Sequence, residues 1–332
     1  MTAFSIGDFS VPAGGRKTVE LPISVLANHT PVNLPVHVVH GQEPGPVLFI
    51  SGAVHGDEIL GVEIVRRVVD HQALAKLAGT LLAVPIVNTF GFLNHSRYMQ
   101  DRRDLNRSFP GSDRGSLASL LADMFMREVV MRSHYGIDLH TAALHRSNLP
   151  QIRIAPDEPE LLELARNFAP PVILVSKLRE GTLRQCARDK GVKVLLYEAG
   201  EALRFDEAAI ETGVSGALRV MAGLGMISLE ARDMKARRVS ISQSSTWLRA
   251  PEGGILRSAL QIGAKVSKGL HLGEISNPLG DMSVAVISDD DGIVIGRTNL
   301  PIVNRGDALF HVARMKKPEA PQAPLFDEDE II

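Results

Sequence analysis

The chain has 332 residues, of which 45% are hydrophobic and 22% charged, and its formal net charge is −2. The composition is typical of a globular protein, and the length suits one large and one smaller domain, or two of similar size. The net charge provides no basic field to attract nucleic acid or anionic membranes. A single cysteine, Cys186, excludes an internal disulfide, and the first ten residues lack the pattern of a secretory signal. No apolar run reaches the roughly 20 residues that cross a bilayer. We therefore expect a cytoplasmic protein.

The first 230 residues pass from an alternating pattern to an α/β pattern. Apolar and polar residues alternate in 17–26 and 35–41, which is typical of antiparallel strands at a sheet edge. Short apolar runs then predict buried strands at 46–51, 81–87, 135–140, 151–155 and 193–199. Helical periodicity follows several of these runs, at 58–74, 116–134, 159–169 and 202–226, and Ser116 is placed to cap the second helix. We therefore expect an α/β domain over residues 1–230, with a mixed, mainly parallel sheet flanked by helices.

After residue 230 the pattern changes to short β-rich pieces separated by glycines, at 250–260, 263–276, 281–296 and 303–313. Such spacing predicts a small all-β barrel or sandwich domain over residues 231–315. The last segment, 316–332, is proline-rich and then acidic, which predicts a flexible tail.

Polar side chains follow three of the predicted strands: His55 and Glu58 after the first buried strand, His140 at the end of 135–140, and Glu198 within 193–199. Loops at the carboxyl ends of strands line the ligand crevice of open α/β sheets. His55 and Glu58, three residues apart, can grip one ion, and a third ligand from another strand would complete a site of two histidines and one glutamate, a common catalytic zinc arrangement. Singly, each residue could instead be a solvated turn, a core histidine or a paired carboxylate. Their joint placement favours a metal site.

Two further features adjoin these residues. Asp138 lies two residues before His140, so in a strand both project to one face and the carboxylate could orient the imidazole, although structural pairing elsewhere is an equal alternative. The segment 94–111 carries Arg97, Arg102, Arg103, Asn106 and Arg107, whose planar forks and amide suit a substrate carboxylate. By composition alone, a solvated loop paired internally with Asp101 and Asp104 is the better interpretation of this segment.

Four pieces in this order, "GAVHGDE" (52–58), "RYMQDRRDLNRSFPG" (97–111), "DLHTA" (138–142) and "EAG" (198–200), resemble the succinylglutamate desuccinylase/aspartoacylase family. The resemblance covers about residues 40–315 and implies a fold related to the zinc carboxypeptidases. It implies one Zn²⁺ per chain bound by His55, Glu58 and His140. It also implies that Glu198 is the catalytic glutamate, that Arg97 polarises the scissile carbonyl, and that Asn106 and Arg107 hold a substrate carboxylate.

One departure concerns the substrate. Aspartoacylase-like enzymes are expected to bring a tyrosine from the C-terminal domain to the substrate, yet the only tyrosines here are Tyr98, Tyr135 and Tyr197. The resemblance therefore does not carry over N-acetylaspartate or succinylglutamate as substrates. We expect the β domain to line or gate the cleft.

The hypothesis is a zinc-dependent hydrolase that cleaves the amide bond of a small N-acylated amino acid or related amine through metal-activated water. Its expected partner is a small molecule bearing a carboxylate, with no nucleic acid or membrane, and homo-oligomerisation is expected only from its general frequency. The alternatives are a zinc carboxypeptidase acting on a short peptide or cell-wall fragment, and a metal-binding module without turnover. A nucleophilic Cys186 is disfavoured because no histidine accompanies it in the sequence.

Overall fold

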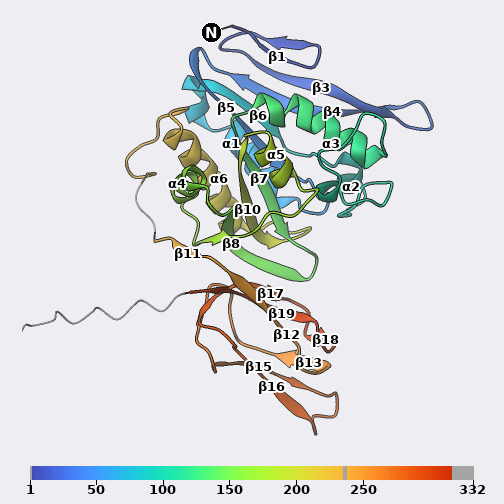
Figure 1. The fold of residues 1–332 in the computed structure, drawn as a ribbon, viewed down its shortest axis with the longest axis vertical. Coiled ribbons are helices and arrows are strands. Elements are labelled where there is room, and N and C mark those ends of the chain that lie inside the picture. The colour runs from blue at the N-terminus through green and yellow to red at the C-terminus, as the bar shows by residue number, and fades with distance from the viewer. Residues whose placement is uncertain (1, 235–237, 316–332) are drawn as a thin grey trace, which may run out of the picture.

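The computed structural model describes residues 2–234 and 238–315, so the expected tail lies outside the described residues. One continuous mixed sheet of 13 strands runs through this part of the chain (Figure 1). Its path is β12 (Ser245–Arg249), β19 (Ala308–Arg314), β17 (Gly292–Thr298), β8 (Arg146–Ile154), β10 (Lys193–Glu201), β7 (Tyr135–Ala142), β5 (Glu43–Gly52), β6 (Ala78–Val84), β4 (Pro31–His40) and β3 (Arg16–Val25). Beside this path lie β9 (Val172–Val175), β11 (Ser240–Ser242) and β14 (Lys265–Val266).

The centre of the sheet is parallel. β10, β7, β5 and β6 are parallel neighbours, so their carboxyl ends meet at one edge. β4 and β3 add antiparallel strands on one side, as the alternation in 17–26 and 35–41 predicted, and β8 pairs antiparallel with β10 on the other. The expected mixed α/β sheet is confirmed, and its parallel centre places the residues that follow β5, β7 and β10 side by side.

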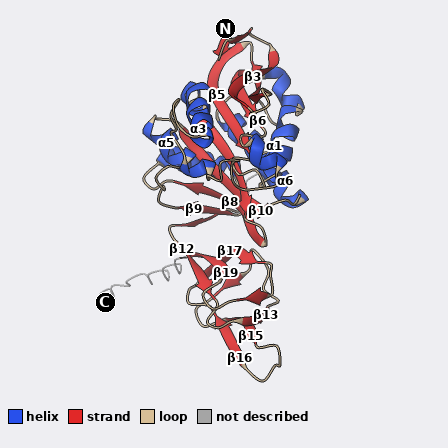
Figure 2. Ribbon diagram, turned by 90° about the vertical axis from the view of Figure 1, so that its right-hand side faces the viewer, coloured by secondary structure: helices blue, strands red, loops and turns tan. Residues whose placement is uncertain are grey.

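Helices cover both faces of the sheet (Figure 2). α1 (Leu60–Val69), α4 (Pro159–Phe168) and α6 (Glu207–Gly223) pack in the hydrophobic cluster on one face, and α3 (Leu117–Glu128) and α5 (Leu183–Asp189) in the cluster on the other. The remaining helical elements are α2 (Thr89–Leu93) and the 3₁₀ turns η1 (Gln72–Lys76), η2 (Leu105–Arg107) and η3 (Val130–Arg132). Among the described residues, no helix has both the length and the apolar character needed to cross a membrane.

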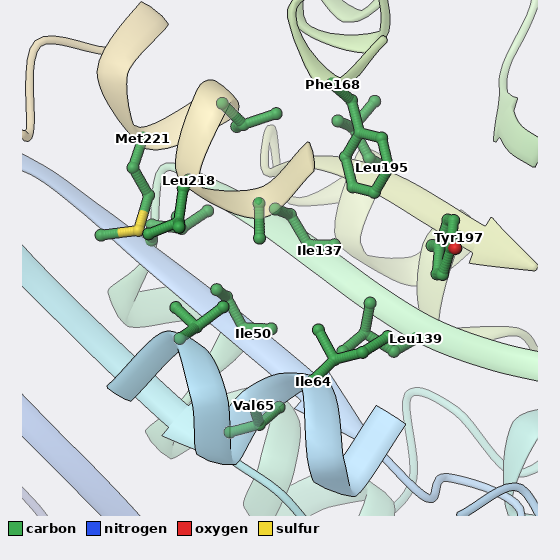
Figure 3. Close-up of a cluster of buried hydrophobic side chains, with 14 of the residues drawn as sticks. Ile50, Ile64, Val65, Ile137, Leu139, Phe168, Leu195, Tyr197, Leu218 and Met221 are labelled. Atoms are coloured by element: carbon green, nitrogen blue, oxygen red, sulfur yellow. The ribbon is translucent and has the colours of Figure 1, made fainter. Parts of the chain in front are cut away.

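The core on the first face joins the sheet to α1, α4 and α6 (Figure 3). Ile137 and Leu139 of β7 lie near Ile64 of α1, while the rings of Phe168 and Tyr197 pack at a tilt of 35°, with 5.1 Å between their centroids. These side chains are fully buried, and each contributes roughly 1.5–3 kcal/mol of transfer free energy to folding. The core therefore holds the parallel strands as a rigid support for the residues at their carboxyl ends.

Two helices are shorter than their periodicity predicts. The helix expected over 58–74 stops at Val69, and His71 starts a separate 3₁₀ turn by accepting the amide of Ala73. The helix expected from 202 begins at Glu207 because Asp206 caps it, whereas Ser116 caps α3 as predicted. A small hairpin of β1 (Phe4–Ile6) and β2 (Phe9–Val11) covers the core on the second face.

The C-terminal strands form the expected separate, strand-rich domain. A four-stranded sheet of β16 (Ser283–Ile287), β15 (His271–Ser276), β13 (Gly254–Arg257) and β18 (Ile302–Val303) packs on β17 and β19 around its own apolar core. The domain is joined to the α/β part because β17 pairs with β8 through Gly296 and Asn148 (Figure 1). Residue 230, where the sequence predicts the domain boundary, lies between α6 and β11. The strand β11, beyond this position, still pairs with β9 of the α/β part.

Candidate active site

The turn after β5 places His55 and Glu58 together. Both side chains are buried, and Nδ1 of His55 lies 2.7 Å from Oε1 of Glu58. The turn needs glycine at position 56, since a Cβ there would run into the backbone of Gly91. Gly61 has a similar role at the start of α1, where a Cβ would lie 2.8 Å from that of Leu139. The two glycines therefore allow the turn to pack directly against the end of the sheet.

His140 reaches the same point from β7, the parallel neighbour of β5. Its Nδ1 lies 2.7 Å from Oε2 of Glu58, so each carboxylate oxygen of Glu58 faces one imidazole. One donor atom from each of His55, Glu58 and His140 falls within 4.8 Å of the other two. Two nitrogens and a carboxylate oxygen converging in a buried position form a donor set that suits zinc.

A second carboxylate contacts the Nε2 atom of each imidazole, on the side of the ring away from Glu58. Nε2 of His140 lies 2.8 Å from Oδ2 of Asp138, whose Oδ1 accepts a hydrogen bond from Ser51 at 2.8 Å. Nε2 of His55 lies 3.2 Å from Oδ1 of Asp104. Such outer carboxylates fix the ring orientation of metal-binding histidines and leave Nδ1 for the ion. Asp138 occupies the position considered from the sequence, whereas Asp104 was considered only as an ion-pair partner of nearby arginines.

The charges of this group are strongly coupled. Burial alone would raise the pKa of Glu58, but His55 and His140 outweigh burial and hold it well below its usual range. Burial would lower the pKa of His140, but Asp138 and Glu58 raise it well above the ordinary value. The carboxylate thus stays ionised between two imidazoles that attract positive charge, and a divalent cation would replace their protons.

The arginine segment folds over this group. Arg97 lies between Glu58 and Asp104. Its Nη1 is 3.3 Å from Oε1 of Glu58, and its Nη2 is 2.9 Å from Oδ2 of Asp104. Asn106 and Arg107 belong to η2, where the side-chain oxygen of Asn106 accepts the amide of Leu183 at 2.9 Å and so fixes the start of α5. The guanidinium of Arg107 donates from Nη1 to the backbone carbonyl of Asn106, and both side chains line a cleft.

Glu198 lies on β10 directly opposite His140 in the parallel register. Its Oε2 accepts a hydrogen bond from Nδ2 of Asn148 at 2.7 Å, and its Oε1 lies 3.8 Å from Nη2 of Arg153. All seven residues selected from the sequence line one cleft of about 590 Å³: His55, Glu58, Arg97, Asn106, Arg107, His140 and Glu198.

The rest of the cleft wall has no signature in the sequence. Five further cations line it, namely Arg146, Arg153, Lys177, Arg179 and Arg184. The β domain adds Ser245, Trp247 and His311, so the expected contribution of this domain to the cleft wall is observed. Trp247 and His311 stack at 4.6 Å with an interplanar angle of 9°, and Arg146 lies over the indole at 5.4 Å. Only long-range pairing of β8 with β17 and of β19 with β12 brings these residues to the site.

Cys186 lies on α5 and is buried, outside the residues that line this cleft. Burial raises the pKa of its thiol, and Asp189 adds to the effect. A thiol of this kind is a poor nucleophile, in keeping with the sequence interpretation.

An α/β sheet with a His–Glu–His group at the carboxyl ends of its parallel strands, in a cleft to which a β domain contributes, is the arrangement of a metal-dependent hydrolase. Residues 44–224 match the model of the succinylglutamate desuccinylase/aspartoacylase catalytic domain, and the chain belongs to this family. The activities that name the family break amide C–N bonds other than peptide bonds.

Known proteins similar to this chain include an N-alpha-acetyl-L-2,4-diaminobutyric acid deacetylase of Halomonas elongata, 27% identical over 297 residues that cover 86% of each chain. The product-bound structure of the ectoine utilization protein EutE (DoeB) from Ruegeria pomeroyi superposes with a TM-score of 0.80 at 21% identity, covering 90% of this chain and 95% of that one. A succinylglutamate desuccinylase/aspartoacylase from Rhodobacter sphaeroides gives a TM-score of 0.78 at 24% identity, with 90% and 94% covered. These structures share the fold over about nine tenths of this chain.

Proposed function

We propose that the protein is a zinc-dependent deacylase that hydrolyses the amide bond of a small N-acylated amino acid. The observation that carries this proposal is the convergence of His55, Glu58 and His140 with Glu198 in one cleft. The named deacetylase activity of the Halomonas relative supports acyl-amide hydrolysis over peptide cleavage. Zinc at one ion per chain and a cytoplasmic location belong to the same proposal.

Three residues would hold the ion and four would act on the substrate. Zinc, when bound, lowers the pKa of its water towards about 7 and polarises a carbonyl oxygen. Glu198 takes the proton of the attacking water and passes it to the departing amine. The hydrogen bond from Asn148 orients the carboxylate of Glu198 for this transfer. Arg97 lies 3.3 Å from Glu58 and can donate to the carbonyl oxygen as charge develops there. Asn106 and Arg107 bind the carboxylate of the amino acid.

A hydrolysis screen with metal analysis tests the proposal. The purified protein is assayed against N-acetyl and N-succinyl amino acids and short peptides, alongside Glu198→Gln and His140→Ala. We expect about one zinc per chain in the wild type and in Glu198→Gln, loss of zinc in His140→Ala, and turnover of N-acyl amino acids only by the wild type.

The other outcomes assign other functions. Cleavage of peptides alone would indicate a carboxypeptidase, and bound zinc without turnover of any substrate would indicate a binding module. Normal turnover by Glu198→Gln would contradict the proton transfer assigned to Glu198.

A further inference from the structure

The strand β16 forms an open edge of the four-stranded sheet in the β domain. In the order β16, β15, β13, β18 it pairs only with β15, so its other side meets no strand in the described part of the chain. It lies at the end of the β domain away from the α/β part (Figure 2). An edge strand presents unpaired N–H and C=O groups, which can pair with a strand of another chain.

Two other edges in the molecule are protected against such pairing. β3, at the edge of the large sheet, carries Arg16, Lys17 and Pro22. β18, at the opposite edge of the small sheet, has only two residues and follows Pro301. Charged residues, proline and short strands are the usual means by which proteins block their sheet edges. The five residues of β16, SVAVI, include neither a charge nor a proline.

Apolar side chains gather along this edge. Residues 279–287 hold four of the thirteen large apolar side chains that are exposed among the described residues: Leu279 at 87%, Met282 at 63%, Val284 at 37% and Ile287 at 47%. Val284 lies opposite the buried Ile275 of β15, and Val286, two residues further on the same face, is 1% exposed. The apolar core of the β domain therefore continues along β16 to an uncovered margin.

The backbone of β16 has free groups on the same margin. The carbonyl oxygen of Met282 accepts the amide of Asn277 at 3.1 Å, so the backbone of Met282 faces β15. Backbone groups alternate in direction along an antiparallel strand, and those of Ser283 and Ala285 therefore point away from β15. No described strand pairs with them.

We propose that two copies of the chain pair edge to edge through β16, antiparallel about a twofold axis at Val284. The two four-stranded sheets then form one sheet of eight strands. In this register Ser283 lies opposite Ala285 of the partner subunit, and their outward N–H and C=O groups form hydrogen bonds. Met282 lies opposite Val286 of the partner subunit, so the two apolar cores join on one face. The interface is isologous and goes beyond the proposed function.

Charge selects this register. With the axis at Val284, Asp281 lies opposite Ile287 of the partner subunit, and Asp289 lies opposite Leu279 of the partner subunit. Moving the axis by one residue to Ala285 would place Asp281 opposite Asp289 of the partner subunit, and like charges directly opposite each other destabilise a strand pair. No residue of 271–291 lines the cleft, so pairing leaves both active sites accessible.

Sedimentation of the full-length protein tests the pairing. The interface is small, so we expect a dimer with a Kd of about 10 μM, seen as a rise in mass from one chain to two between about 1 and 100 μM. Hydrogen exchange should slow with concentration in a peptide that covers 281–288. A monomer throughout this range would overturn the proposal, and so would a dimer that leaves exchange in 281–288 unchanged.

Paired charges on the exposed positions Ser283 and Ala285 test the register. Ser283→Lys with Ala285→Lys should raise the Kd at least about 10-fold, and so should Ser283→Glu with Ala285→Glu, since each charge then faces a like charge in the partner. An equimolar mixture of the two variants should dimerise with a Kd within about threefold of the wild type, because unlike charges then meet. A mixture that stays monomeric although thermal unfolding shows both variants folded would overturn the proposed register.

Ile302→Lys on β18 is the matched control. Ile302 is 75% exposed at the opposite edge of the same sheet, so it presents a comparable apolar side chain on a strand that the proposal leaves free. Its Kd should equal that of the wild type. A dimer lost in Ile302→Lys and kept in both charge variants would place the interface at β18 and overturn the assignment to β16.

Discussion

The side-chain amide of Asn148 donates to Oε2 of Glu198 at 2.7 Å, which ties the expected proton shuttle to β8, the strand shared by both parts of the molecule. β8 pairs with β10 on one side and with β17 of the β domain on the other. Asn148 is 9% exposed, so this hydrogen bond is shielded from water. The residue that holds Glu198 is thus also the one that pairs with Gly296 of the β domain.

Asn148→Ala is expected to lower kcat about fivefold, because a hydrogen bond of roughly 1 kcal/mol then no longer orients the carboxylate. Zinc content should stay that of the wild type, since Asn148 contacts none of the proposed ligands. Steady-state kinetics with metal analysis measure both quantities. Asn33→Ala, on the distant strand β4, is the control. An unchanged kcat in Asn148→Ala would show that Glu198 holds its orientation without this bond.

Gly296→Ala should reduce turnover from outside the cleft. A Cβ at Gly296 would lie 2.8 Å from Oδ1 of Asn148 and 3.2 Å from Cβ of His311, so the asparagine must shift. We expect a lower kcat and a loss of about 1–3 kcal/mol in the free energy of unfolding. Gly253→Ala in the same domain meets only ordinary contacts of 3.6 Å or more and serves as the control. If Gly296→Ala loses stability but keeps the wild-type kcat, the contact between Gly296 and Asn148 does not affect the orientation of Glu198.

Asp138→Asn is expected to weaken zinc binding 10- to 100-fold, the usual cost of changing an outer carboxylate. Asp138 is fully buried and holds Nε2 of His140 at 2.8 Å, while Ser51 fixes its other oxygen. Competition with a chromophoric chelator gives the affinity. Asp123→Asn on α3, where the carboxylate pairs with Arg127, is the matched control. The same zinc affinity in Asp138→Asn and wild type would remove Asp138 from the site.

The sequence predicts those parts of the molecule that depend on local pattern. Apolar runs placed the parallel strands, and the residues that follow β5, β7 and β10 meet because carboxyl ends of parallel neighbours share an edge. His55, Glu58, His140 and Glu198 could therefore be selected together. The boundaries of α1 and α6 were less predictable because single side chains, His71 and Asp206, cap new turns within a continuous periodic pattern.

The wall of the cleft opposite the metal ligands could not be predicted in this way. Arg153 lies in an ordinary apolar run, and Trp247 and His311 lie in short strands of the β domain that carry no motif. Their convergence follows from antiparallel pairing between β8 and β17, whose residues are about 150 positions apart in the chain. A contact of this range leaves no periodic trace in either segment.

His311 should make the protein less stable in acid. Its pKa in the folded protein, lowered to about 3 by burial and by Arg153, lies well below the value near 6.5 of an unfolded chain. Between these values the unfolded chain binds a proton that the folded protein does not, so the free energy of unfolding falls as the pH decreases from about 6.5. At pH 4 this effect amounts to roughly 3 kcal/mol.

His311→Phe keeps an aromatic ring against Trp247 but has no proton to bind, so its stability should fall less steeply between pH 6.5 and 4 than that of the wild type. Urea unfolding at several pH values measures the slope, and His271→Phe, an exposed histidine on β15, is the control. Carboxylates paired in the folded protein, such as Glu58 and Asp104, contribute to the acid loss equally in all three proteins. Parallel slopes for His311→Phe and wild type would mean that folding does not lower the pKa of His311.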